Sequence, residues 1–357
     1  MALYPDIKRG MNILKQLIFG SLLLLIGTFP AKGMDVQKLQ QELYDAGYAI
    51  TVDGILGNET RRQLAKFFKD NSYEFDGVIS EQTLEDILSL KKKFYRPIPW
   101  IFHDEFESIK WNRYNESHAP RNLGRIGHIK IENENNGNSY LSLTSKIGQL
   151  SKFNRGDDRY IKDRVELETP KRFRKFNLNN RILWYGFKIK SPSANFNPNA
   201  HSIVFTQYKQ IQKNAQKKDC AELFWRMSTR HNGRTWIVVK NEKGEKTEKY
   251  IPNFITNSWS KVKVGVYFTE SDKGWLRAYI NGQLVYSYKG RTVMNRFRSC
   301  RPISFENHLR IGLYRGSDKK KLGGKTIKDD QSDTLHFDDF VVTDSSAKVD
   351  QVLSAKN

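Results

Sequence analysis

The spacing of apolar residues changes near residue 100, and this change constrains the fold more than any other feature of the chain. Before it, apolar residues recur every three or four positions, as in Val36, Leu39 and Leu43, which indicates an amphipathic helix. After it, apolar and polar residues alternate in runs such as 184–189 and 262–268, which indicates β-strands. The sequence therefore predicts a small helical domain followed by a larger β domain.

The composition around these runs predicts the domain boundaries. Pro97 and Pro99 follow a run of lysines and interrupt helix between the two periodic parts. Beyond them, turns such as Asn281-Gly282 separate the alternating runs, which is typical of an antiparallel, mainly β, jelly-roll (concanavalin-like) sandwich. The expected segments are a signal peptide at 1–33, a helical domain at 34–90, a linker at 91–99, a sandwich at 100–345 and a tail at 346–357.

The N-terminus has the features of an export signal. Lys15 precedes an apolar run, residues 17–26, and the small residues Ala31 and Gly33 form a signal peptidase pattern. The run is shorter than the roughly 20 apolar residues of a membrane-spanning helix. We expect cleavage after Gly33, with an uncleaved membrane anchor as the alternative, and we place the rest in the periplasm, the cell envelope or the medium.

Charge and cysteine content narrow the partners. Sixty Lys and Arg residues against 39 Asp and Glu residues give a formal charge of +21, which attracts polyanions. Because export removes the chain from genomic DNA, we expect no nucleic-acid partner. The two cysteines, Cys220 and Cys300, are expected to form a disulfide in an oxidising compartment, since no spacing with histidine suggests zinc.

A repeated Asp-Gly turn in the helical part carries a family resemblance. Asp53-Gly54 leads to Thr60, and Asp76-Gly77 leads to Thr83, each ahead of a new apolar stripe. With the preceding Leu39-Gln40, these residues resemble the three-helix peptidoglycan-binding domain. The usual Phe-Gln after the second helix is Phe-Phe here. The resemblance implies peptidoglycan as a further partner, and the alternative is a helical spacer that binds no sugar.

Strand parity selects polar side chains on the side of the sandwich away from its core. Val165 and Leu167 are expected to point inward, so the residues between and beside them are expected to point outward. The same reasoning applies to the runs 205–209, where the parity is less regular, and 308–314. The residues expected on this outer side are Arg164, Glu166, Gln207, Lys209, His308, Arg310 and Tyr314.

These strands resemble the jelly-roll polysaccharide lyases, which include alginate lyases, glucuronan lyases and the first class of heparin lyases. The similarity lies in Arg164 to Leu167, in Gln207 with Lys209, in the segment 275–282, and in the segment 309–315. The terminal Phe-Asp-Asp-Phe at 337–340 is also typical of such sandwiches. The resemblance implies an exported lyase that cleaves a uronate-containing polysaccharide by β-elimination.

The resemblance also implies roles for the selected residues. Arg164 and Gln207 would stabilise the enolate-like intermediate, and His308 stands where the alginate lyase pattern has a proton-transferring tyrosine. Tyr314 or Tyr208 would donate a proton to the leaving oxygen. The catalytic candidates are His308, Gln207, Arg164 and Tyr314, and the substrate-binding candidates are Glu166, Lys209, Arg310, His201 and Arg315.

Other interpretations remain open at this point. Replacement of the family's tyrosine by His308 is equally consistent with a non-catalytic protein that tethers an acidic glycan to the cell wall. A glycoside hydrolase ranks last, because the expected strand with spaced carboxylates is absent from the sequence. We expect no cofactor; a structural calcium ion is left open at 157–158 or 329–330, where aspartates occur in pairs.

Overall fold

The chain folds into two compact units, which are described separately. One unit comprises residues 1–43 and 50–89, and the other comprises residues 44–49 and 90–357. The computed structural model describes residues 34–46, 48, 50–94, 102–107, 129–146, 160–169, 173, 178–194, 196, 198, 202–212, 221–230, 233–241, 245–293, 305–318 and 332–355. The expected signal peptide and the Cys220–Cys300 disulfide lie outside the described residues. Within the described part of the chain, no helix is long and apolar enough to cross a membrane.

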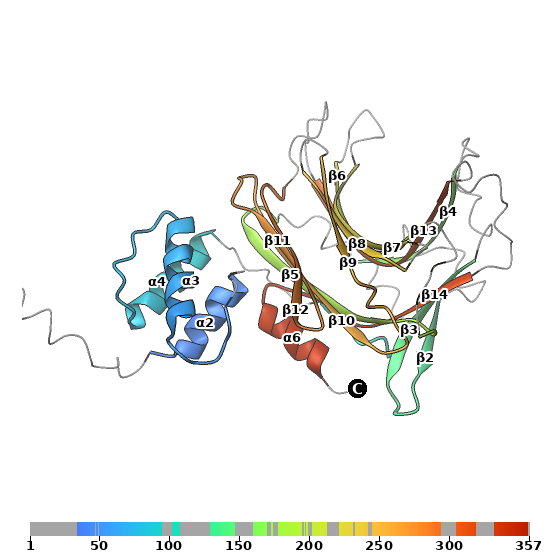
Figure 1. The fold of residues 1–357 in the computed structure, drawn as a ribbon, viewed down its shortest axis with the longest axis horizontal. Coiled ribbons are helices and arrows are strands. Elements are labelled where there is room, and N and C mark those ends of the chain that lie inside the picture. The colour runs from blue at the N-terminus through green and yellow to red at the C-terminus, as the bar shows by residue number, and fades with distance from the viewer. Residues whose placement is uncertain are drawn as a thin grey trace, which may run out of the picture. The chain divides into compact units, whose positions relative to one another are not determined.

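The helical unit contains the three predicted helices, α2 (Val36–Asp45), α3 (Asn58–Asp70) and α4 (Glu81–Phe94) (Figure 1). Apolar side chains from all three helices are buried, as the helical periodicity predicts. On the third helix, the apolar spacing of Leu84, Ile87 and Leu88 predicts a buried stripe, and this prediction is wrong for Leu88 alone. Leu88 is 38% exposed, whereas Thr83, Ile87 and Leu90 are buried on that helix.

The side chain of Gln40 explains why the first Asp-Gly turn follows a Leu-Gln pair. Its amide oxygen accepts hydrogen bonds from the backbone N–H groups of Asp53 (3.0 Å) and Gly54 (2.7 Å). Its amide nitrogen donates to Asp53 Oδ1 (2.8 Å) and to Thr60 Oγ1 (3.0 Å). Gly54 has φ +75°, which favours glycine. A buried amide that is satisfied on both ends thus holds the loop between the first two helices.

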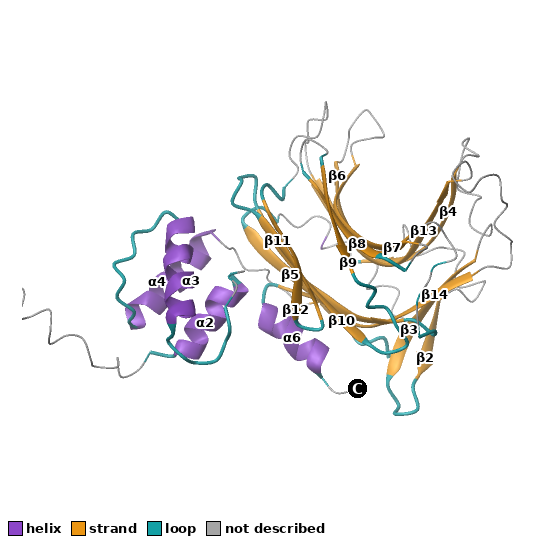
Figure 2. Ribbon diagram, in the orientation of Figure 1, coloured by secondary structure: helices purple, strands orange, loops and turns teal. Residues whose placement is uncertain are grey.

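The second unit is a sandwich of two antiparallel sheets, as predicted (Figures 1 and 2). The eight-stranded sheet runs in the order β12 (Gln283–Lys289), β11 (Trp275–Ile280), β10 (Ser260–Phe268), β5 (Arg181–Lys190), β14 (Ser332–Thr343), β3 (Ser139–Lys146) and β2 (Ile129–Asn133), with β1 (Phe102–Asp104) paired to β14. The six-stranded sheet runs in the order β4 (Tyr160–Glu168), β13 (Phe305–Asp318), β6 (Ser202–Gln212), β7 (Ala221–Arg230), β8 (Thr235–Lys240) and β9 (Lys246–Ile251).

Alternate residues of the two sheets form one apolar core between them. Tyr185 on β5 and Trp225 on β7, for example, stack across the interface with ring centroids 5.1 Å apart. The six-stranded sheet is curved, and its concave side faces away from the eight-stranded sheet (Figure 1). We call this concave side the open face, because the core lies on the other side.

Residues 346–354, assigned from the sequence to a tail, instead form helix α6 (Ser346–Ser354) on the outer side of the eight-stranded sheet (Figure 1). Ser345 caps the helix by accepting a hydrogen bond from Lys348 N. Val349 and Leu353 are buried in a second apolar cluster with Trp184. A Cβ at Gly186 would lie 2.6 Å from Val349, so a glycine is needed for the helix to approach β5 this closely.

This packing predicts that the C-terminal helix contributes to stability. Leu353→Ala removes a side chain that is 2% exposed, and we expect the free energy of unfolding to fall by about 2–3 kcal/mol. Denaturant unfolding of both proteins measures the difference. Gln351→Ala, on the exposed side of the same helix, is the control and should have little effect. Equal stability of wild type and Leu353→Ala would contradict a structural role for this helix.

Candidate functional site

A register shift and a glycine decide how the side chains of β6 and the pairing of β4 are arranged on the open face. A register shift between Val204 and Thr206 makes Phe205 and Thr206 face the core in succession, after which Gln207 faces outward. On β13, Gly312 has φ +142°, and a Cβ there would lie 2.2 Å from the carbonyl oxygen of Val165. Glycine at this position therefore lets β4 pair closely with β13. The first shift also explains the irregular parity of the run 205–209.

A network of charged side chains lies on the open face where β4, β13 and β6 meet. Glu168 accepts two hydrogen bonds from β13, from His308 Nδ1 (2.6 Å) and from Arg310 Nε (2.8 Å). On the next row, Gln207 Nε2 donates to Glu166 Oε1, and Arg310 Nη1 lies 3.9 Å from Glu166 Oε2. Two carboxylates, a guanidinium, an imidazole and an amide thus position one another.

This network is buried, which changes the interpretation of two sequence-predicted residues. The exposed fractions are 1% for Glu166, 2% for Gln207, 4% for His308 and 2% for Arg310. Glu166 was expected to bind substrate, but its carboxylate is an internal acceptor for Gln207 and repels an anionic ligand. Arg310 was also expected to bind substrate, and it is held by Glu168 instead. Both are placed to orient their neighbours.

The other predicted residues differ in how far the structure locates them. Tyr314 and Lys209 are half-buried on the open face, and Tyr314 pairs in register with Arg164 on β4. The side chains of Arg164 and Arg315, and the whole of His201, lie outside the described residues. Tyr208, an alternative proton donor, is in the core instead and donates to Asn307 Oδ1. Burial raises the pKa of Tyr208 well above its usual value, so it is a poor donor.

Two residues of this face were missed from the sequence. Glu168 has the same strand parity as Glu166, and that signal alone was sufficient to find it. Arg226 on β7 pairs in register with Gln207 and is half-buried. Burial lowers the pKa of Arg226, and the nearby carboxylate of Glu248 opposes this shift. Arg226 also interacts electrostatically with Tyr314. The adjacent Trp225 is in the core, so strand alternation at this position was the signal that could have found Arg226.

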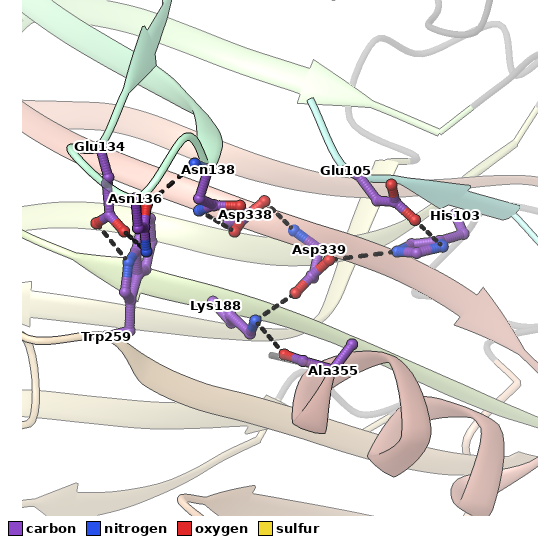
Figure 3. Close-up of polar contacts among 10 residues, drawn as sticks. All are labelled: His103, Glu105, Glu134, Asn136, Asn138, Lys188, Trp259, Asp338, Asp339 and Ala355. Atoms are coloured by element: carbon purple, nitrogen blue, oxygen red, sulfur yellow. Dashed lines mark hydrogen bonds and ion pairs between the residues drawn. The ribbon is translucent and has the colours of Figure 1, made fainter. Parts of the chain in front are cut away.

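A second polar cluster lies on the eight-stranded sheet, around Asp338 and Asp339 (Figure 3). Lys188 Nζ lies 2.6 Å from Asp339 Oδ2, and His103 Nε2 lies 3.4 Å from Asp339 Oδ1. Asn138 donates to Asp338 Oδ2 (3.1 Å). Burial, and then the charge of Asp339, raise the pKa of Asp338 to about 6. Lys188 supplies the positive charge that faces this pair of carboxylates.

The titration of Asp338 predicts a pH-dependent stability. Its pKa is about 6 in the folded chain against an ordinary value of 3.8, so folding favours the protonated form. The stabilisation is present below about pH 4 and is lost as the pH rises through about 6. Asp338→Asn does not titrate, so we expect its free energy of unfolding relative to wild type to increase by about 1–2 kcal/mol from pH 4 to pH 7.

Denaturant unfolding at several pH values measures this difference. Asp272→Asn removes a carboxylate from an exposed turn and controls for the change in net charge. A difference between Asp338→Asn and wild type that stays constant across this range would contradict the raised pKa.

Within the described residues, no group of three or more His, Cys, Asp and Glu side chains is arranged to hold a metal ion. The aspartate pairs at 157–158 and 329–330, where calcium was left open, lie outside the described residues. The open face offers carboxylates, basic groups and a hydroxyl for proton transfer and for binding an anion.

Two family models match the chain. A model described as polysaccharide lyase matches residues 106–341, and a model described as putative peptidoglycan binding domain matches residues 32–87. The first covers the sandwich and the second covers the helical unit. Both agree with the resemblances found in the sequence.

Among solved structures, the chain is similar to an endo-β-1,4-glucuronan lyase from the fungus Trichoderma reesei, with 13% identity over 70% of this chain and 97% of that chain and a TM-score of 0.46. It is also similar to an alginate lyase from Pseudomonas aeruginosa, with 10% identity over 59% of this chain and 84% of that chain and a TM-score of 0.40. An alginate lyase from a Chlorella virus has 11% identity over 60% of this chain and 88% of that chain, with a TM-score of 0.38.

Proposed function

Because the chain belongs to the polysaccharide lyase family, we propose that it cleaves a uronate-containing polysaccharide by β-elimination on the open face of its six-stranded sheet. One observation carries this proposal: Glu168 orients His308 and Arg310 by hydrogen bonds on the open face, which the half-buried Arg226 and Tyr314 share. This arrangement puts an oriented imidazole, a phenol and a guanidinium on one face. Those are the groups that elimination next to a carboxylate requires.

The proposed reaction begins with removal of the proton on C5 of the uronate. With Nδ1 of His308 donating to Glu168, the neutral ring accepts a proton at Nε2, and we assign it as the base. The electron pair of the C5–H bond forms the C4=C5 double bond as the C4–O4 bond breaks. The departing oxygen then takes that proton from the His308 imidazolium, because Tyr314 lies six residues farther along β13, roughly 20 Å away at about 3.3 Å per residue. The products are an unsaturated sugar end and a new free hydroxyl.

Stabilisation of the intermediate requires cationic or hydrogen-bonding groups at the substrate carboxylate. Gln207 and Arg310 already donate to internal glutamates, so we assign them mainly to positioning. Arg226 and Lys209 are half-buried on the same face, and we propose that they bind the carboxylate together with Arg164. A guanidinium in a partly desolvated site interacts more strongly with a carboxylate than the same group in water.

We further propose that the enzyme is exported and acts in the periplasm, at the cell envelope or outside the cell. The apolar run at 17–26, the formal charge of +21 and the match to a peptidoglycan-binding domain support this location. The helical unit would bind peptidoglycan and hold the lyase near an acidic polymer.

Incubation of the full chain with alginate, glucuronan, heparin-like and pectic polymers tests the activity. We expect the absorbance of the unsaturated product to rise with at least one of them and to stay constant with a neutral polysaccharide. Binding to an acidic polymer without product from any of the four would contradict the lyase proposal. That result would instead support a non-catalytic tether for an acidic glycan.

A further inference from the structure

Two aromatic side chains lie on the open face at the edge of the six-stranded sheet farthest from β4. Trp236 on β8 pairs in register with Tyr250 on β9 and with Ser228 on β7. Ser228 pairs with Val204, and Val204 pairs with Tyr314. Because paired residues in a sheet point to the same side, Trp236 and Tyr250 share the face of Tyr314.

Two arginines cover the rings of this aromatic pair. The guanidinium of Arg230 lies 4.3 Å from the centroid of Trp236, and that of Arg234 lies 5.5 Å from the centroid of Tyr250. The two ring centroids are 5.9 Å apart, with planes tilted by 54°. Tyr250 is 45% exposed, although an aromatic residue on a strand is more often packed in a core. We call Arg230, Arg234, Trp236 and Tyr250 the distal platform.

The charge around the distal platform is positive. Glu248 is the acidic neighbour, and its carboxylate lies 3.6 Å from Arg230. It also attracts Arg226, which lies between the platform and the network at His308. Arg226, Arg230 and Arg234 therefore outnumber this carboxylate by three to one. Aromatic rings pack against the C–H face of a sugar, and arginines bind its carboxylate, so this combination fits an acidic saccharide.

The distal platform is too far from His308, the proposed base, to contact the same sugar. Strands in a sheet lie about 4.8 Å apart, and three strand steps separate β13 from β8, which gives roughly 14 Å. A sugar ring is much smaller than this distance. A ligand that spans both places must therefore be a chain of several sugars lying across the strands.

From these observations we propose that the distal platform is a second saccharide-binding subsite, which binds an acidic sugar unit several positions away from the bond that is cleaved. The inference rests on the proposed function in one respect, namely that the open face binds an acidic polysaccharide. It adds that the enzyme recognises an extended stretch of polymer. Long oligosaccharides should accordingly bind more tightly than short ones.

Calorimetric titration with uronate oligosaccharides of increasing length tests this subsite. His308→Ala serves as the reference protein, so that substrate is bound without being cleaved. In that background we expect Trp236→Ala to weaken binding of the long oligosaccharides about tenfold, from the loss of one stacking contact. Binding of disaccharides, which are too short to reach both places, should stay the same. Trp236→Phe keeps an aromatic face and should restore most of the affinity.

Two further variants keep the test independent of folding and of net charge. Tyr250→Ala changes an exposed residue on an edge strand, and it should weaken the binding of long oligosaccharides in the same way. Lys249→Ala removes a positive charge from the same strand, but its side chain points to the other side of the sheet, so affinity should not change. Equal affinity of Trp236→Ala, Tyr250→Ala and the reference protein for long oligosaccharides would overturn the subsite. Equally tight binding of neutral oligosaccharides would overturn its acidic specificity.

The outcomes separate this inference from the lyase proposal. Length-dependent binding that requires Trp236, with no unsaturated product from wild type, would support the subsite and reject the lyase chemistry. Elimination by wild type with no effect of Trp236→Ala on affinity would reject the subsite alone. Tight binding of acidic proteins in place of saccharides would also reject the subsite.

Discussion

His308→Ala is expected to lower the rate of elimination by about a thousandfold, the largest effect of any single substitution that we predict. Proton transfer by a positioned side chain typically accounts for a factor of about 10²–10⁴ in rate. The alanine substitution removes the ring nitrogen that we propose accepts the C5 proton of the uronate. The rate is measured from the absorbance of the unsaturated product under saturating polymer, and affinity is measured separately by calorimetry.

Two variants make this result specific to proton transfer. His308→Gln retains an amide that can hydrogen-bond to Glu168, and we expect it to fold like wild type while remaining inactive. His103→Ala changes a histidine on the eight-stranded sheet and should leave the rate unaltered. If His308→Ala turned over polymer within a few-fold of the wild-type rate, another group would have to be the base.

Glu168→Ala is expected to reduce the free energy of unfolding by about 3–5 kcal/mol. Glu168 is fully buried and accepts from both His308 and Arg310, so its removal leaves a buried guanidinium with a weaker partner. The remaining carboxylate near Arg310, that of Glu166, is 3.9 Å from the guanidinium and compensates only in part. Denaturant unfolding at neutral pH measures this change.

A double-mutant cycle tests whether the loss comes from this pairing. Replacing Arg310 with alanine as well should recover part of the stability, because the unpaired buried charge is then removed. Glu248→Gln, in an ion pair of 3.6 Å that is partly exposed, is the control and should cost less than about 1 kcal/mol. A loss below about 1 kcal/mol for Glu168→Ala would show that the buried network is not important for stability.

The secondary structure was predicted well from local patterns. The alternating runs 184–189, 262–268 and 308–314 lie in strands, and the three helical stripes lie in helices. Each of these patterns depends on residues two to four positions apart, which backbone geometry relates directly. The prediction for Leu88 is wrong because local spacing does not fix the rotation of a helix about its axis. A small rotation of this helix buries Leu90 and exposes Leu88.

The alternation of apolar and polar residues along one strand does not predict where the pairing of two strands shifts. The shift between Val204 and Thr206 arises from pairing with β7, a different segment of the chain, and it decides which side of the sheet Gln207 faces. Burial of the network has the same origin, because Glu166 and Glu168 receive hydrogen bonds from β6 and β13. No rule based on one strand identifies those donors.

The sequence by itself determined a helical unit, a β-sandwich, the family resemblance and most of the polar residues on one face of the sandwich. Only the tertiary structure decided that His308 is held by Glu168, which is 140 residues away in the chain. It also decided that Arg226 adjoins this network and that Trp236 and Tyr250 extend the same face. The reason is physical: parity assigns a side chain to one side of its own strand, whereas neighbours on that side depend on strand order and register.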